Sequence, residues 1–238
     1  MAHAEQLDFV ARVRTMVPCA FAARRVLEIG SLDINGAVRD LFVDCDYTGI
    51  DVAPGPGVDL VCQGQDFSDP DASFDSVICC EVMEHNPHWK ETFLNMARLC
   101  KPGGLVLMTC ATTGRQEHGT TRTSPADSPL SIGLGWDYYR NLTARDFRRA
   151  VKLHELFDAF RFYRHRTSCD LYFVGFRRNA GLPPKIGYKF AALQQHYLLE
   201  SVRGALAHIK MRVLIALVGE ERYRSGPVRF RFRWHKRQ

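Results

Sequence analysis

Acidic side chains and histidines stand directly after several short apolar runs of this sequence, and they are the residues that could do chemistry. Asp51 follows the run YTGI, while Glu81 and His85 follow the run FDSVICC. A carboxylate at such a position can accept hydrogen bonds from both hydroxyls of a ribose. A histidine, with an unperturbed pKa of ~6.5, can remove a proton near neutral pH. The pattern indicates a ligand pocket with a proton acceptor beside it.

The first apolar run, RVLEI, ends at Gly30 and contains Glu28. A glycine there lets the backbone turn tightly against a ligand. The loop that begins with Gly30 and Ser31 is therefore a candidate ligand-binding loop. Glu28 has a second interpretation, because it could pair with Arg24 or Arg25 at the surface.

The second and third apolar runs lead to further candidates. Asp51 stands about 20 residues after Gly30, the spacing of a ribose-binding acid, although it could instead only end its strand. The third run leads to Asp66 and Phe67. An acid beside an aromatic ring can pair with the amino group of adenine and cover the ring. Asp69 and Asp71 lie close by and are alternatives to Asp66.

Two histidines are candidate general bases. His85 follows the fourth apolar run, and His118 lies in a polar segment, residues 111–142, which has no periodicity. A loop of this length in a compact domain is often functional. His85 could instead begin the helix that follows Pro87, and His118 could be a solvated loop residue.

The same polar segment holds a cluster of aromatic residues. Trp136, Tyr138 and Tyr139 stand within four residues of one another. Aromatic rings beside a pocket suit stacking on a sugar or a flat ring. We expect this segment to form a lid that selects the substrate. In the other interpretation, Trp136 and one tyrosine hold the loop onto the core.

The elements that must position these residues alternate between strands and helices. The apolar runs predict strands at residues 25–29, 47–52, 58–62, 74–80, 105–110, 162–167 and 171–177. Helices are predicted at 5–17, 37–43, 87–99 and from a Thr143-x-x-Asp146 capping box to about residue 160. The runs lack clean alternation, so the strands are expected to be buried on both faces of a mostly parallel sheet. The last two strands are expected to form an antiparallel hairpin.

Charge divides the chain after the Pro183-Pro184 pair. Residues 182–238 hold 12 basic and 3 acidic residues, a net charge of +9, whereas residues 1–181 hold 20 basic and 23 acidic residues, a net charge of −3. We expect an N-terminal helix at 1–23, a domain at 24–180 and a basic helical extension at 181–238. Within the extension, one predicted helix carries an apolar stripe of Leu198, Val202, Leu206, Ile209, Val213 and Leu217.

The basic extension has several interpretations. A basic helix with aromatic residues suits an anionic membrane surface, and its charge also suits RNA or another acidic polymer. It could equally pack on the domain and present a basic outer face. The sequence ends in the alternating run VRFRFRWHK.

Membrane-spanning and secreted classes are not expected. No stretch approaches the ~18 consecutive apolar residues of a transmembrane helix, and the N-terminal residues do not resemble a signal peptide. The eight cysteines include no Cys-x-x-Cys pair and lie mostly inside apolar runs. We expect a reduced, cytoplasmic protein without a metal site.

Five short segments together resemble the class I S-adenosylmethionine-dependent methyltransferases, in particular the methyltransferase type 11-like domain. They are VLEIG, YTGIDV, QDF, CEVMEH and KPGG, in the order and approximate spacing of that family. The resemblance covers about residues 24–178. It implies a Rossmann-like α/β fold with a seven-stranded, mostly parallel sheet, an antiparallel last strand and helices on both faces. The first segment departs from the Gly-x-Gly-x-Gly array of the family, because Leu32 and Ile34 replace its second and third glycines.

The resemblance also implies S-adenosylmethionine as the cofactor and a role for each matching residue. Glu28, Gly30 and Ser31 would contact the methionine end. Asp51 would hold the ribose, with Val52 against the adenine. Asp66 and Phe67 would contact the adenine, and Glu81 would lie near the sulfonium.

The function we expect is methyl transfer to an oxygen or nitrogen of a small molecule or saccharide. One alternative is a methyltransferase that acts on RNA or lipid headgroups through the basic extension. Another is a non-catalytic binding protein on the same fold. Failure to bind either S-adenosylmethionine or S-adenosylhomocysteine would exclude the enzyme. Equal binding of liposomes and RNA with and without the extension would exclude a role for the extension in recruiting either.

Overall fold

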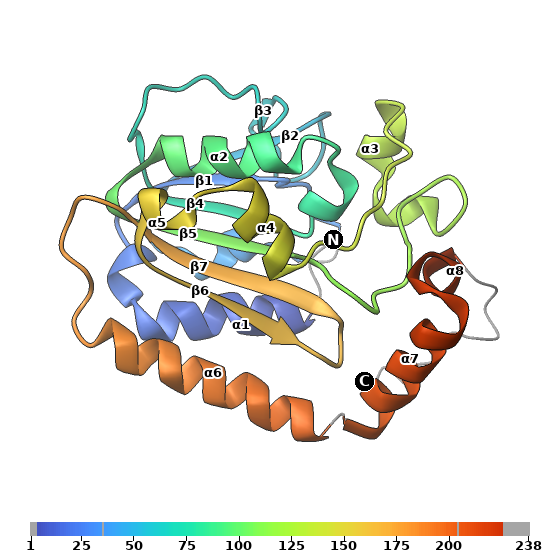
Figure 1. Cartoon of the computed structure of the whole chain (residues 1–238). Coiled ribbons are helices and arrows are strands. Elements are labelled where there is room, and N and C mark those ends of the chain that lie inside the picture. The colour runs from blue at the N-terminus through green and yellow to red at the C-terminus, as the bar shows by residue number, and fades with distance from the viewer. Residues whose placement is uncertain (1–3, 35, 204, 226–238) are drawn as a thin grey trace.

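The computed structural model describes residues 4–34, 36–203 and 205–225 and contains one seven-stranded sheet (Figure 1). The strand order is β3-β2-β1-β4-β5-β7-β6. The strands are β1 (Arg25–Ile29), β2 (Asp46–Asp51), β3 (Leu60–Val61), β4 (Phe74–Cys80), β5 (Cys100–Ala111), β6 (Phe157–His165) and β7 (Asp170–Arg177). The first five strands pair in parallel, and β7 is antiparallel to both of its neighbours. The predicted α/β fold class is confirmed.

Helices cover both faces of this sheet, and each face has its own apolar core (Figure 1). On one face lie α1 (Ala4–Met16), the 3-10 turn η2 (Val38–Leu41) and α6 (Ile186–Arg203). On the other lie α2 (Trp89–Leu99), α4 (Ala144–Ala150) and α5 (Leu153–Leu156). Because both faces are buried, the strands read as continuous apolar runs.

Strand register brings the candidate residues to one edge. Ile29, at the end of β1, pairs with Ile50 of β2 and with Cys79 of β4. The residues that follow these strands therefore lie side by side at the carboxyl edge, where open α/β sheets bind ligands.

The predicted helix from Thr143 to residue 160 is wrong in its second half. Its start is confirmed, because the side chain of Thr143 accepts from the backbone N–H of Asp146, and Asp146 accepts from the N–H of Thr143. Val151 is extended and ends α4, and after the single turn of α5 the chain enters β6 at Phe157. The aromatic residues of the segment FDAFRFYRH pair across β7 instead of forming a helix face.

Smaller elements also differ from the expectation. The predicted helix at 37–43 is only the 3-10 turn η2, and the predicted strand at 58–62 is only two residues long. The segment Lys101–Gly104, the KPGG of the family resemblance, lies within β5 and forms an irregularity there, with Gly103 at φ +73°. The 3-10 turns η1 (Pro18–Ala20) and η3 (Met83–His85) complete the first half of the chain.

Two further short elements lie in the long polar segment 111–142. They are the 3-10 turn η4 (Pro125–Asp127) and the helix α3 (Pro129–Gly133). The rest of the segment is irregular.

The described part of the basic extension forms three helices instead of one. They are α6, α7 (Ala205–Val218) and α8 (Glu220–Ser225), and Gly219, at φ +83°, separates the last two. Within the described ranges, no helix is both long and apolar enough to cross a membrane. The side chain of Leu206 and the run VRFRFRWHK lie outside the described residues.

Candidate functional site

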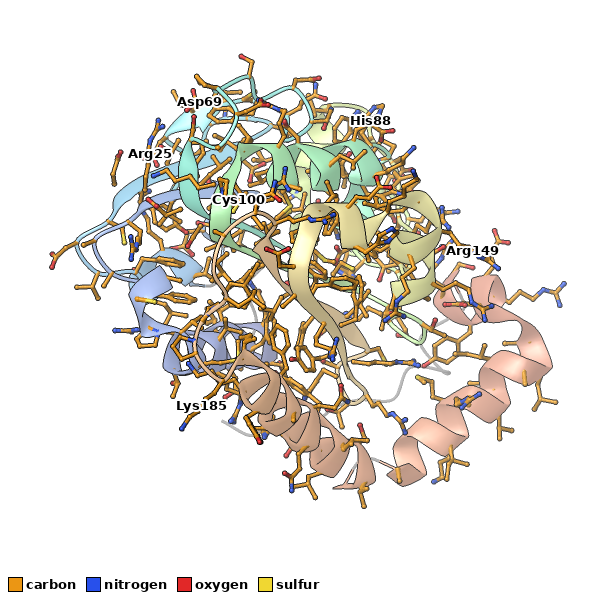
Figure 2. All side chains as sticks on the ribbon, turned by 60° about the vertical axis from the view of Figure 1, so that its left-hand side comes forward. Arg25, Asp69, His88, Cys100, Arg149 and Lys185 are labelled. Atoms are coloured by element: carbon orange, nitrogen blue, oxygen red, sulfur yellow. The ribbon has the colours of Figure 1, made fainter. Side chains whose placement is uncertain are left out.

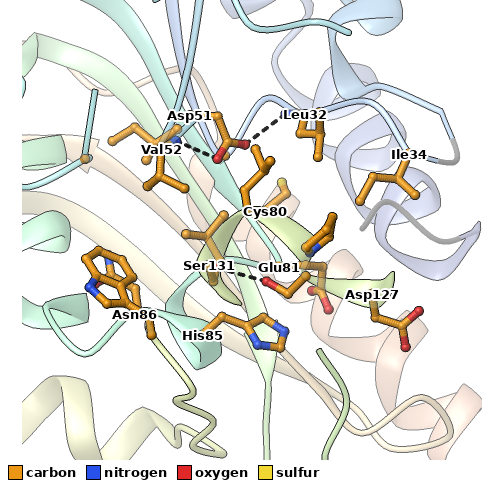
Figure 3. A pocket seen from close by; sticks show the side chains of 18 of the residues that line it. Leu32, Ile34, Asp51, Val52, Cys80, Glu81, His85, Asn86, Asp127 and Ser131 are labelled. Atoms are coloured by element: carbon orange, nitrogen blue, oxygen red, sulfur yellow. Dashed lines mark hydrogen bonds between the residues drawn. The ribbon is translucent and has the colours of Figure 1, made fainter. Parts of the chain in front are cut away.

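A pocket opens at the carboxyl edge of β1, β2 and β4 (Figure 3). Its wall combines the loop after β1, the ends of β2 and β4, and part of the polar segment. The described residues that line it are Ile29, Gly30, Leu32, Ile34, Asp51, Val52, Cys62, Gly64, Cys80, Glu81, Val82, His85, Asn86, Asp127, Ser128, Pro129, Leu130, Ser131 and Trp136. The pocket thus joins the predicted cofactor residues to the predicted lid.

Gly30 is required by two features of the loop after β1. Its φ is +82°, a conformation that side chains disfavour. A Cβ built on it would clash with Cγ2 of Val82. The glycine therefore lets the loops after β1 and β4 touch at the pocket wall.

Asp51 ends β2 and faces the pocket (Figure 3). One carboxylate oxygen accepts from the backbone N–H of Val52 at 2.7 Å, and the other accepts from the N–H of Leu32 at 3.0 Å. Burial raises the pKa of Asp51, and these two hydrogen bonds oppose that shift. The bonds fix the carboxylate in place while each oxygen keeps a lone pair for a ligand.

Glu28 is buried on the sheet face that also carries Val26, beneath α1. It accepts a hydrogen bond from the Tyr47 hydroxyl at 2.8 Å, and burial raises its pKa to about 7. It does not lie among the described residues that line the pocket. The surface pairing with arginine is not formed either: Arg25 pairs with Asp69 at 3.0 Å (Figure 2).

The structure does not bring Ser31, Asp66 or Phe67 to the pocket wall among the described residues. The Ser31 side chain is buried against Gly49. Asp66 is exposed, and the ring of Phe67 packs toward Phe74 with centroids 6.2 Å apart. The same segment contributes Cys62 and Gly64 to the wall instead.

The alternatives to Asp66 are used elsewhere. Asp69 pairs with Arg25, and Asp71 pairs with Arg98 at 2.7 Å. Neither acid lines the pocket among the described residues.

Glu81 stands at the end of β4 in an unusual conformation. Its φ is +56°, which is rare for a residue with a side chain and costs on the order of 1 kcal/mol or more. Its N–H is held by the backbone oxygen of Thr109 at 2.9 Å. The side chain is buried and lines the pocket. Such strain is found where a site requires it.

His85 and His118 meet beside the pocket, although 33 positions separate them. Their ring centroids lie 5.0 Å apart, and the ring of Tyr139 lies 5.3 Å from the first and 5.0 Å from the second. Gly119 approaches so closely that a Cβ there would lie 2.8 Å from Cε1 of His85. His118 is therefore packed against other rings and is not a solvated loop residue.

Burial keeps both histidines neutral. It lowers the pKa of His118 to about 4 and that of His85 well below its usual value. Nδ1 of His118 lies 3.0 Å from the carbonyl oxygen of Gln116 and, as the donor there, leaves Nε2 as an acceptor. Nδ1 of His85 is buried without a hydrogen-bond partner among the described residues. Because His85 lines the pocket, it is the better-placed proton acceptor.

Glu84 is a buried carboxyl that sequence reasoning overlooked, although it directly precedes His85. One oxygen accepts from the N–H of Ala111 at 3.0 Å, and burial raises its pKa to about 8. Glu84, His85 and His118 also offer ligand atoms within 4.8 Å of one another, so they are the described residues that could hold a metal ion. The absence of a metal site stays a prediction.

The three aromatic residues of the polar segment take different places. Trp136 lines the pocket and packs edge-on against His88, with centroids 5.7 Å apart. Tyr139 is buried, and its hydroxyl donates to the carbonyl oxygen of Gln116 at 3.1 Å. Tyr138 is half-buried and does not line the pocket among the described residues. Trp136 thus has the position of a substrate contact, and Tyr139 that of a support.

Helix α8 of the basic extension reaches this segment, which the sequence did not indicate. Arg224 donates to the carbonyl oxygen of Tyr139 at 3.1 Å, and its guanidinium lies 5.8 Å from the ring centroid. The Arg224 guanidinium also lies 3.5 Å from the fully buried carboxylate of Glu117. Arg122 pairs with the same carboxylate at 2.9 Å. On α7, Met211 packs against Gly114. The extension therefore holds the loop that carries His118.

Glu84→Gln should change how stability depends on pH. The pKa of Glu84 is about 8 in the folded chain, against about 4.5 for the exposed group. The unfolded chain loses that proton first, so the wild type should lose stability as pH rises from about 4.5 to 8. Glutamine can keep the bond from Ala111 without a titrating proton. Denaturant unfolding measures this effect. Between pH 5 and 8, the free energy of unfolding of the variant should rise relative to that of the wild type by at least ~1.4 kcal/mol, which corresponds to one pKa unit. Parallel profiles would contradict the shift.

Comparison with known proteins agrees with this geometry. A methyltransferase domain family matches residues 1–164 of the chain. The chain belongs to this methyltransferase family. The family resemblance predicted from the sequence is thereby confirmed. The matched residues include the sheet edge and the whole polar segment 111–142, and they end before the basic extension.

Individual relatives match the chain over part of its length. The ubiquinone biosynthesis O-methyltransferase of Maricaulis maris is 36% identical over 122 residues, which are 50% of this chain and 41% of that protein. The phosphoethanolamine N-methyltransferase 2 of Haemonchus contortus was solved with S-adenosyl-L-methionine (15% identity, TM-score 0.53) and with phosphomonomethylethanolamine and S-adenosylhomocysteine (16%, TM-score 0.54). These structures share 72% of this chain and 52–53% of theirs, and at this identity they show the fold alone. The chain spans about half the length, or less, of these relatives.

Proposed function

We propose that the chain binds S-adenosylmethionine in this pocket and transfers its methyl group to an oxygen or nitrogen of a small-molecule or saccharide acceptor. The observation that carries the proposal is one pocket wall that holds Gly30, Asp51, Glu81 and His85. The first three suit a cofactor with a ribose and a cationic centre. The fourth suits an acceptor that must lose a proton.

The donor set fits the cofactor. Asp51 keeps a free lone pair on each oxygen, which suits two ribose hydroxyls. Leu32, Ile34 and Val52 supply apolar contact for an adenine ring or a methylene chain. The buried carboxyl of Glu81 faces the same space and favours positive charge. S-adenosylmethionine, when bound, supplies a methyl group on a cationic sulfur.

The residues of the chain then have distinct tasks. The pocket holds the acceptor in line with the methyl carbon, since proximity and orientation supply most of the acceleration in a displacement of this kind. Asp51 and Glu81 would hold S-adenosylmethionine, which would supply its methyl carbon to the acceptor oxygen or nitrogen, and the electron pair of the carbon–sulfur bond would stay with sulfur. Nδ1 of His85 accepts the proton that the acceptor loses. The O-methyltransferase relative and the N-methyltransferase structures are consistent with either acceptor atom.

Exchange of residues 125–135 for a Gly-Ser linker of equal length tests this assignment. The wild type should bind S-adenosylmethionine and S-adenosylhomocysteine in calorimetry and transfer a labelled methyl group to members of a hydroxyl and amine panel. The exchange removes Asp127–Ser131 from the wall but keeps the buried residues Glu117 and Tyr139. It should abolish transfer and leave cofactor binding. Loss of both would assign the segment to the cofactor site, and no binding by the wild type would overturn the proposed function.

The proposed location is the cytoplasm. All eight cysteines are free thiols, and Cys79, Cys80, Cys100 and Cys110 are buried in the core. A reducing compartment suits this arrangement.

A further inference from the structure

Helix α7 exposes an apolar face that no described residue covers. Ile209, Val213 and Leu217 are 57%, 53% and 76% exposed. They stand four residues apart and therefore form one stripe. On the other side of the helix, Met211 packs against Cys169. One face of α7 thus fixes it to the domain, and a second apolar face points outward.

Two basic residues border this stripe. At 3.6 residues per turn, Lys210 falls on one side of it and Arg212 on the other, and both are exposed. The helix contains no acidic residue. An interfacial helix has the same arrangement: aliphatic side chains enter the acyl boundary, and long basic side chains reach the headgroups.

The neighbouring parts of the extension have the same character. Helix α6 exposes Leu198, Leu199 and Val202 by 53%, 55% and 73%, and Lys185 precedes it (Figure 2). The two helices meet at an angle at the periphery of the molecule (Figure 1). Residues 226–238, outside the described ranges, add five basic and three aromatic residues and no acid to the sequence. Apolar exposure and positive charge therefore coincide in this extension.

We propose that the outer face of α7, with its flanking basic residues, binds the surface of an anionic lipid bilayer. The 14 residues of α7 span about 21 Å, which is less than the ~30 Å hydrocarbon core of a bilayer. The helix therefore lies on the membrane and does not cross it.

Two other occupants fit the observations less well. A second copy that docked α7 against α7 would bring Lys210 and Arg212 against the same charges, with no acid on the facing helix to pair with them. The phosphates of RNA could pair with the basic residues, but RNA would leave the stripe exposed. Single-stranded bases stack on aromatic rings, and the stripe is aliphatic.

Vesicle binding of the full chain tests the proposal. The wild type should sediment with vesicles of phosphatidylcholine containing phosphatidylglycerol and not with phosphatidylcholine alone. The triple variant Ile209→Ser, Val213→Ser, Leu217→Ser should bind the anionic vesicles at least tenfold more weakly. The double variant Lys210→Gln, Arg212→Gln should bind them about 30-fold more weakly, at roughly fivefold per basic residue near the surface.

Matched controls separate this result from misfolding. Val61→Gln and Leu94→Gln also remove exposed apolar side chains, which are 58% and 37% exposed, but outside the extension, and they should leave vesicle binding unchanged. Calorimetry with S-adenosylhomocysteine should give the same affinity for the triple variant as for the wild type, which tests the proposed function separately. Unchanged vesicle binding by the triple variant would overturn the proposal. A wild type that does not bind anionic vesicles would also overturn it, if that chain binds RNA instead. The same holds if that chain self-associates and the triple variant does not.

Discussion

Replacing His85 with alanine is expected to lower the turnover number for methyl transfer by roughly 10²–10⁴-fold, the usual contribution of a general base. The imidazole lines the pocket, and its Nδ1 is buried without a hydrogen-bond partner among the described residues. Affinity for S-adenosylhomocysteine should change little, because Asp51 and Gly30 remain in place. Steady-state turnover and calorimetry measure the two effects separately.

The pH dependence sharpens this expectation. Burial holds the pKa of His85 well below its usual value and that of His118 at about 4, so both imidazoles are neutral acceptors near physiological pH. Wild-type turnover should therefore stay level between about pH 6 and 8 and fall only in more acidic solution. His85→Gln keeps a polar side chain without a basic nitrogen and should lose turnover as well. Full activity of that variant would exclude a base at this position. His154→Ala, an exposed histidine on α5, is the matched control.

Replacing Asp51 with alanine is expected to weaken binding of S-adenosylmethionine and S-adenosylhomocysteine alike, by at least ~10-fold. Each hydrogen bond to a charged group contributes about 1.5–3 kcal/mol. The variant would lose the bonds to the ribose, and it would also leave the N–H groups of Leu32 and Val52 without their acceptor. Because both ligands carry the same ribose, their affinities should fall by the same factor in calorimetry.

The matched control lies at the other end of the same strand. Asp46 begins β2, its side chain is 75% exposed and it lies 3.5 Å from Arg25. Asp46→Ala should leave both affinities unchanged. If Asp51→Ala binds as tightly as this control, the ribose is held elsewhere.

The strand ends could be located from the sequence, and the direction of the side chains only partly. Gly30, Asp51 and Glu81 follow apolar runs, and parallel strands place such residues at one edge. Glu28 also belongs to the first run, but side chains alternate along a strand, and its own points under α1 to Tyr47. Gln65–Phe67 follows only a two-residue strand, so its contacts depend on loop packing that no periodicity records.

Contacts between distant segments could not be predicted. His85 and His118 come together because Gly119 permits a close approach, and Tyr139 fills the third side. The capping box is a local signal, and it correctly predicted the start of α4. The predicted continuation of the helix to residue 160 was wrong, because from Phe157 onward pairing with β7 outweighs helix propensity.

The extension shows the same limit. Spacing identified the stripe Ile209, Val213 and Leu217, but α7 is apolar on two sides. The packing of Met211 against Gly114 and Cys169 decides which side faces the domain.

The two-sided packing of α7 and α8 makes thermodynamic linkage a property of this chain. The inner sides of the two helices touch Gly114, Glu117 and Tyr139 of the loop beside the pocket, while α7 keeps its outer side free for another ligand. If an outer ligand favours this arrangement of the helices, it must raise the affinity for any pocket ligand that orders the same loop. Reciprocity then requires the pocket ligand to raise the affinity of the outer surface by the same factor. An acceptor in the pocket would thus be sensed at a surface that it never touches.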